Sequence, residues 1–190
     1  MQVNGKMNKV YEQSGQKIRC TIERLREWLR QVASEHQGEE VVFICIGTDR
    51  STGDALGPLV GSRLAQSGLK VIGTMEEPCD ATNLEFRISS LRKEEVTIAI
   101  DACLGHPGSV GQYLVRYSSL QPAESVGADM PAVGQYSIAC VVNVNGPKPY
   151  WTLQTTSLHH VMKMADDVAG AIIESFLPQP SINPNHLPYK

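Results

Sequence analysis

Short apolar runs alternate with amphipathic stretches along most of this chain. The continuous, β-branched runs at residues 41–46 and 96–100 are typical of strands that are buried on both faces of a sheet. Further strands are expected at 69–73, 110–117, 135–143 and 151–154. Because helical patterns separate the first three strands, the sequence predicts a βαβαβ order and a largely parallel sheet.

Apolar residues recur at helical spacing between these runs. Residues 18–37 are expected to form one helix, with apolar positions at Ile18, Ile22, Leu25, Leu29 and Val32. A second helix is expected at 55–66, with Asp54 as its N-cap. Another is expected to begin at Asp80 or Thr82 and to continue through Leu91.

The order of these elements favours a single domain. A final helix at 157–176 has a wide apolar face, and no linker divides the chain. We therefore expect an α/β protein, a three-layer α/β/α sandwich over residues 17–177. Residues 1–16 are polar and aperiodic, and residues 178–190 are rich in proline, so both are expected to be tails.

The overall composition excludes several classes of function. Of 190 residues, 42% are hydrophobic and 19% are charged, as in globular proteins. The 17 basic and 20 acidic residues give a net charge of −3, so we expect neither a nucleic acid nor an anionic membrane as partner. No apolar run is long enough for a membrane span or a secretory signal.

The five cysteines are widely separated, which does not fit a local zinc site. They are Cys20, Cys45, Cys79, Cys103 and Cys140. An odd number of isolated cysteines favours free thiols and a cytoplasmic protein.

Two aspartates lie at the ends of predicted parallel strands, the edge at which α/β proteins bind ligands. Asp54 lies in the loop after the strand at 41–46, and Asp101 ends the strand at 96–100. A right-handed βαβαβ winding brings these strand ends close together. Two neighbouring carboxyls can act as acid and base at neutral pH, or can share a divalent metal.

Each aspartate also has a purely structural interpretation. Asp54 can serve only as a helix cap, and Asp101 can mark the point at which a strand reaches solvent. The glycine-rich loop at 47–57 lacks phosphate-loop and dinucleotide-binding motifs, so nucleotide binding is not expected. We expect no cofactor, unless Asp54 and Asp101 share a divalent metal.

Other reactive groups in the sequence are weaker candidates. Cys103 lies near His106, but no recognised nucleophile signature surrounds either residue. The histidine pair at 159–160 fits an exposed helix start or a single metal ligand. The aspartates at 166–167 fit the solvated face of the last helix, and residues 148–151 fit a strand-entry turn or a small recognition surface.

The residues around both aspartates resemble a known family. The stretch Gly-Thr-Asp-Arg-Ser-Thr-Gly-Asp-Ala-Leu-Gly-Pro at 47–58 is similar to a Gly-Asn…Thr-Pro-Asp-Ala-Leu-Gly-Pro segment of the germination protease of spore-forming bacteria. Ile-Asp-Ala at 100–102 resembles the second Asp-Ala motif of that protease. Residues 41–176, with Val-Met-Lys-Met-Ala at 161–165, resemble the YyaC-type sporulation proteins, relatives of that protease.

This resemblance implies a fold and a site. The fold is the α/β/α type of the hydrogenase maturation peptidases, which is phosphorylase/hydrolase-like, and Asp54 and Asp101 match the two aspartates of an acid peptidase site. In the hydrogenase maturation peptidases a Glu, an Asp and a His hold the nickel of the immature partner. Asp54 and Asp101 match the first two, and no motif places the His. Thr48 and Gly53 depart from the Asn and Pro of the germination protease.

We therefore expect a sporulation-associated peptidase that hydrolyses a protein or peptide substrate, with a spore protein as the substrate that the resemblance implies. The resemblance also implies a location in the forespore or spore cytoplasm. The alternative hypothesis is a non-catalytic sporulation factor that binds a peptide or protein partner in the same crevice.

Overall fold

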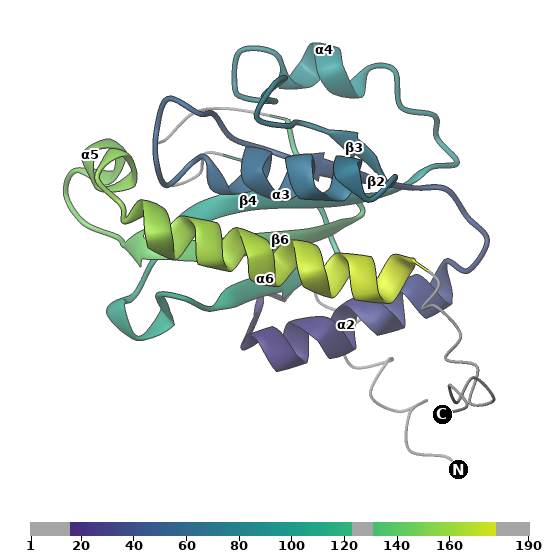
Figure 1. Cartoon of the computed structure of the whole chain (residues 1–190), viewed down its shortest axis with the longest axis horizontal. Helices are drawn as coiled ribbons and strands as arrows, with labels where there is room; N and C mark the ends of the chain where they lie inside the picture. Colours follow the sequence, from purple (N-terminus) through teal and green to yellow (C-terminus); the bar gives the residue numbers. More distant parts are fainter. Residues whose placement is uncertain (1–15, 123–130, 178–190) are drawn as a thin grey trace, which may run out of the picture.

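A six-stranded mixed sheet forms the centre of the structure, a computed structural model that describes residues 16–122 and 131–177 (Figure 1). The strands are β1 (Ile18–Cys20), β2 (Val41–Cys45), β3 (Lys70–Ile72), β4 (Val96–Gly105), β5 (Tyr113–Arg116) and β6 (Tyr136–Val144). Their order in the sheet is β1-β5-β6-β4-β2-β3. Strands β6, β4, β2 and β3 are parallel, whereas β5 is antiparallel to both β6 and β1.

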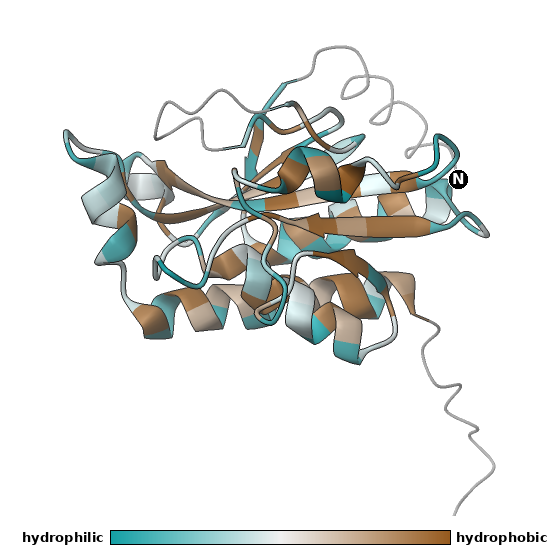
Figure 2. Ribbon diagram, turned by 90° about the horizontal axis from the view of Figure 1, so that it is seen from above, coloured by the Kyte–Doolittle hydropathy of each residue, from teal (hydrophilic) through white to brown (hydrophobic). Residues whose placement is uncertain are grey.

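Helices cover both faces of the sheet, but unequally (Figure 2). The helices are α2 (Ile22–Glu35), α3 (Leu56–Gln66), α4 (Leu84–Ile88), α5 (Pro149–Gln154) and α6 (Leu158–Phe176), with a 3-10 turn η1 (Pro107–Ser109). The three long helices α2, α3 and α6 share one hydrophobic core with one face of the sheet. The short helix α4 packs on the other face, so the expected α/β/α architecture is confirmed.

Alternating side chains of the central strands divide the core into two layers. Ile98 of β4 and Phe43 of β2 pack with the long helices. Ala99 and Ile44, the next residue along each strand, pack on the opposite face with Leu84 of α4. Because both faces of β2 and β4 are buried, these strands carry continuous apolar runs instead of an alternating pattern.

The face opposite the long helices is covered mainly by irregular chain. Cys79, Leu120 and Val133 come from segments outside the strands and join α4 in this second apolar cluster. By the alternation along β4, Asp101 and Cys103 point to the same face as Ala99. Polar groups of the central strands therefore lie on the side that lacks long helices.

Four predictions about local structure are wrong. Residues 18–20 form edge strand β1, because they pair with β5, and the helix begins only at Ile22. Residues 151–154 lie in α5, whose first turn contains Pro149, and are not a strand. Helix α4 ends at Ile88, before Leu91. Strand β4 continues beyond Asp101 to Gly105, because β6 pairs with it to that point.

The predicted tails fall almost entirely outside the described residues. Residues 1–15 and 178–190 are not described, and neither are residues 123–130. In the part of the chain that the structure covers, no helix has the length and apolar character needed to cross a membrane.

Truncation of Phe43 should destabilise the fold strongly. Its ring is fully buried and packs edge-on against Phe176 of α6, with 5.2 Å between ring centroids. Phe43→Ala should lower the free energy of unfolding by about 3–5 kcal/mol, because it leaves a cavity between β2 and the long helices. Urea denaturation measures this value, and Phe86→Ala, at a position 81% exposed, is the matched control with little expected change.

Candidate functional site

The loop between β2 and α3 is folded back on itself by close backbone packing. Gly47 has φ +146°, and a Cβ at this position would collide with the carbonyl group of Asp54. The Thr48 N–H donates to the same Asp54 carbonyl at 3.2 Å. The Gly47 N–H donates to Cys79 O at 2.9 Å, so the loop is also attached to the chain that precedes Asp80.

Asp54 lies at the end of this loop and lines a cavity of about 340 Å³. The N-cap of α3 is Ala55, so the prediction that Asp54 is the N-cap is wrong. Burial raises the pKa of the Asp54 carboxyl, and the nearby Ser51 hydroxyl offsets part of this rise. Partial burial of an acid in this way favours its protonated form.

Asp101 lines the same cavity from the centre of the sheet. It is 9% exposed and lies within β4, so the prediction that it ends the strand at solvent is wrong. The Ala102 N–H donates to Asp101 Oδ1 at 2.8 Å, which orients the carboxyl group. The structure therefore brings Asp54 and Asp101 to the walls of one cavity, as the winding of the chain predicts.

Asp80 is a third carboxyl in this cavity and was not predicted as a site residue. Arg50 Nη2 donates to Asp80 Oδ2 at 2.9 Å, and the Thr82 N–H and hydroxyl both donate to Asp80 Oδ1. Burial by itself raises the pKa of Asp80, but the bonds from Thr82 and the charge of Arg50 more than offset it, so the pKa is lowered. Asp80 is thereby held ionised.

The sequence contains a signal that could have indicated Asp80. It follows β3, a parallel strand whose carboxyl end lies at the same edge of the sheet as the ends of β2 and β4. The prediction of a helix cap at Asp80 or Thr82 is also wrong, because Asn83 is the N-cap of α4.

The remaining wall of the cavity is largely apolar. Ile46, Ala102 and Leu153 contribute to it, and Tyr150 of α5 stands beside them with 63% of its surface exposed. The cavity is thus a small, partly apolar recess whose lining includes three carboxyls. Such a recess can hold a peptide bond between an acid and a base.

The other reactive candidates lie elsewhere. His159 is exposed. The ring of His160 lies next to Gly111, with its Cε1 atom 3.6 Å from the position that a Cβ on Gly111 would take. His106 Nδ1 accepts from the Gly108 N–H within η1, and Cys103 lines a different cavity. The aspartates at 166–167 form ion pairs with Arg63 and Lys163 respectively, which fits the predicted solvated face.

Asp54 and Asp101 are the groups of this cavity that would hold a divalent metal. Asp54 and Asp101 are oxygen ligands of the kind that a hard divalent cation prefers. In residues 16–122 and 131–177, no three His, Cys, Asp or Glu side chains are grouped as a metal site. The cysteines are all free thiols in the described chain, and four of them are buried.

Comparisons with known proteins give one family and two structural neighbours. The profile described as "Protein of unknown function (DUF1256)" matches residues 13–171. "Uncharacterized protein YyaC" of Bacillus subtilis (strain 168) is 45% identical over 141 residues, covering 71% of this chain and 69% of that protein. The predicted YyaC-type relationship is confirmed, and the resemblance to the germination protease stays a prediction.

The two structural neighbours are hydrogenase maturation proteases of Thermococcus kodakarensis. The crystal structure of HycI, from strain KOD1, has a TM-score of 0.49 and 19% identity, over 77% of this chain and 98% of that chain. HybD has a TM-score of 0.46 and 16% identity, over 71% of this chain and 97% of that chain.

The raised pKa of Asp54 should make its contribution to stability depend on pH. The folded protein binds this proton more tightly than the unfolded chain does, so the free energy of unfolding falls as pH rises through the carboxyl range. Asp54→Asn removes this effect and should stabilise the protein at pH 7 relative to wild type, with a smaller difference near pH 4. Urea denaturation at both pH values tests this, with Asp49→Asn in the same loop as the control. A lower stability of Asp54→Asn at pH 7 contradicts the expectation.

Proposed function

Because the chain belongs to the DUF1256 family, whose description assigns no activity, we propose from its site that it is a peptidase-like hydrolase with two aspartates. The observation that carries this proposal is the meeting of Asp54 and Asp101 in one cavity, with the pKa of Asp54 raised by burial. A pair of carboxyls in different environments supplies one acid and one base at neutral pH.

Asp54 is the proton donor in this proposal. Its raised pKa favours the protonated carboxyl, which can donate a hydrogen bond to the carbonyl oxygen of the scissile peptide bond. Asp101 is the general base, and it is oriented by the N–H of Ala102. Asp80 is held by Arg50 and Thr82, which suits it to shape the wall and not to transfer protons.

The reaction proceeds in two balanced steps. In the first step Asp101 takes a proton from a water, the resulting hydroxide adds to the carbonyl carbon, and Asp54 gives its proton to the carbonyl oxygen. The product is a neutral gem-diol, with Asp101 protonated and Asp54 ionised. In the second step Asp101 gives its proton to the leaving nitrogen, Asp54 recovers a proton from one hydroxyl, and the C–N bond breaks.

The substrate in this proposal is a protein or peptide. The apolar recess beside Tyr150 is open to a polypeptide, and the residues at 47–58 and 100–102 resemble the motifs of the germination protease. On that resemblance we propose a protein of sporulating cells as the substrate, and the forespore or spore cytoplasm as the location.

A second candidate function is peptide binding without cleavage. Tyr150 and Trp151 are each 63% exposed on α5, and Tyr150 also lines the cavity. Exposed aromatic residues at the entrance of a recess are typical of recognition surfaces. A non-catalytic sporulation factor would use the same crevice and would not need a proton donor.

Substitution of either aspartate should abolish hydrolysis without unfolding the protein. Asp54→Asn and Asp101→Asn should each reduce cleavage of proteins from sporulating cells by at least about a hundredfold, because each removes a proton-transfer group. Mass spectrometry of new peptide termini measures cleavage, and thermal melting checks folding. Asp49→Asn, in the same loop, should retain wild-type activity. Full activity in both site variants contradicts the two-aspartate mechanism, and binding without cleavage by wild type supports the second candidate.

Cleavage should weaken as the pH rises above the pKa of Asp54. The protonated form of Asp54 is the active one, and burial moves its loss to a higher pH than for an ordinary aspartate. A profile of kcat/KM against pH should therefore show a descending limb at a pH above the usual carboxyl range. A rate that only increases across neutral pH contradicts the assignment of Asp54 as the acid.

A further inference from the structure

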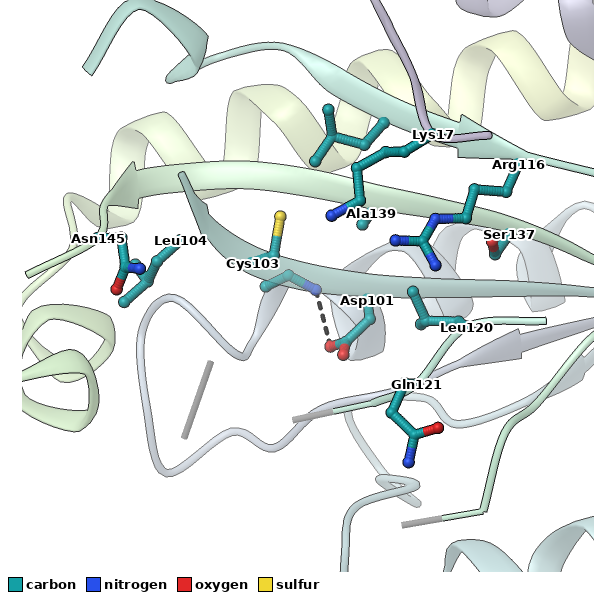
Figure 3. A pocket seen from close by; sticks show the side chains of 12 residues that line it. Lys17, Asp101, Cys103, Leu104, Arg116, Leu120, Gln121, Ser137, Ala139 and Asn145 are labelled. Carbon is teal, nitrogen blue, oxygen red and sulfur yellow. Dashed lines mark hydrogen bonds between the residues drawn. The ribbon is translucent and has the colours of Figure 1, made fainter. Parts of the chain in front are cut away.

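A second cavity, of about 350 Å³, lies beside the candidate site on the face of the sheet that lacks long helices (Figure 3). Asp101 and Ala102 line both cavities, so the two are neighbours. Side chains of β4, β5 and β6 form its floor, and Lys17 reaches it from the chain before β1. The mechanism proposed above uses none of its groups except Asp101 and the Ala102 N–H that orients it.

Two cations face this cavity without a counter-ion. Arg116 of β5 is half-buried, and Lys17 is exposed at the opening. Among the residues that the structure describes, neither side chain forms an ion pair or a hydrogen bond. Other basic side chains of the chain do have such partners, as Arg63 has in Asp166 and Arg26 has in Glu174. A half-buried guanidinium loses hydration, and an anion in the cavity would compensate for that loss.

A buried hydroxyl gives an independent indication of a ligand. Ser137 of β6 is 1% exposed and lines the cavity, and its Oγ has no hydrogen-bond partner among the described residues. Ser137 lies directly opposite Arg116 in the pairing of β5 with β6. A hydroxyl donor and a guanidinium at paired positions form a polar site that an acceptor oxygen would satisfy.

We propose that this cavity binds a carboxylate of the polypeptide substrate, an inference that rests on the proposed function. The planar guanidinium of Arg116 fits the two oxygens of a carboxylate, and the Ser137 hydroxyl donates a further hydrogen bond. The side chains that line the cavity carry two positive charges and the one negative charge of Asp101. A single negative charge balances that set better than the double charge of a phosphate.

The distance between the strands locates the carboxylate relative to the bond that is cleaved. Strand β6 lies between β5 and β4, and Arg116 is level with Ala99, two residues before Asp101. Two strand spacings and two residues along the strand separate Arg116 from Asp101 by about 12 Å. An extended peptide crosses that distance in about three to four residues. The carboxylate therefore belongs to an acidic side chain, or to a chain end, about three to four residues from the scissile bond.

Small amides and acids that differ by one carboxylate test this site directly. N-acetylglutamine carries only a terminal carboxylate, N-acetylglutamate α-amide carries only a side-chain carboxylate, and N-acetylglutamine α-amide carries none. NMR titration at pH 7 and low salt should show binding of one or both acids and at least about tenfold weaker binding of the neutral amide. The acid that binds more tightly identifies the source of the carboxylate.

Substitution of the cations should remove this preference. Arg116→Gln should weaken binding of the acid at least about tenfold. Lys17→Gln is a second variant, at an exposed position where a substitution leaves the fold intact. Arg30→Gln, an equal charge change at an exposed position on α2, is the matched control and should bind as wild type does. Equal binding of the neutral amide, tighter binding of inorganic phosphate, or unchanged binding in both cavity variants would overturn the proposal.

The same measurements separate the carboxylate site from the peptidase reaction. Asp54→Asn should lose cleavage and keep the preference for the acid, because Asp54 does not line the second cavity. If wild type cleaves no protein but binds the acid through Arg116, the peptidase proposal fails and the carboxylate site stands as a ligand site. If wild type cleaves its substrate and Arg116→Gln cleaves acidic and neutral peptides with unchanged kcat/KM, the carboxylate site alone is overturned.

Discussion

The parallel pairing of β4 with β2 on one side and with β6 on the other is the constraint on which the site depends. Cys45 pairs with Ile100, and the Ile46 N–H donates to Ile100 O at 2.8 Å, so the chain leaves β2 beside Asp101. The next N–H, of Gly47, donates to Cys79 O, which brings Asp80 to the same place. Consecutive backbone hydrogen bonds thus position the loop of Asp54 and the segment of Asp80 around Asp101.

The two faces of the sheet differ in composition: one carries the larger apolar core, and the other carries the polar groups of the two cavities. One face is sealed by α2, α3 and α6, whose side chains form the larger apolar core. The other face carries Asp101 and Ser137 inside the sheet, and the Ser137 hydroxyl has no hydrogen-bond partner among the described residues, which costs about 1–3 kcal/mol. The apolar core on the first face compensates for this cost.

The sequence predicts the parts of this arrangement that depend on local patterns. Strands β2 and β4 are recognisable because burial on both faces requires a continuous apolar run. Helix α6 is recognisable because burial of one face requires apolar residues at helical spacing. The approach of Asp54 to Asp101 follows from the handedness of βαβαβ units. The position of Asp101 inside β4 was not predictable, because residues 102–105 become a strand only through pairing with β6, some 35 residues later.

The same reasoning explains why the second cavity has no signature in the sequence. Arg116 and Ser137 become neighbours through the antiparallel pairing of β5 with β6, and Lys17 joins them because β1 adds to the edge of β5. Residues 18–20 have the spacing of a helix, so local pattern favours the wrong element there. Long-range strand pairing forms this cavity, and the spacing of apolar residues along the sequence does not predict such pairing.

The location of both cavities on the sheet limits how a polypeptide can be recognised. Strands β4 and β6 are paired on both sides, so their backbone groups are already used within the sheet. A peptide that crosses from Asp101 towards Arg116 lies over the strands and cannot extend the sheet as an added edge strand, the mode in which backbone bonds give affinity irrespective of side chain. Its affinity must come from side chains and loops, such as the charged groups of the two cavities and the recess beside Tyr150. Under the proposed function, recognition of this kind would select a few sequences and would exclude unfolded chains in general.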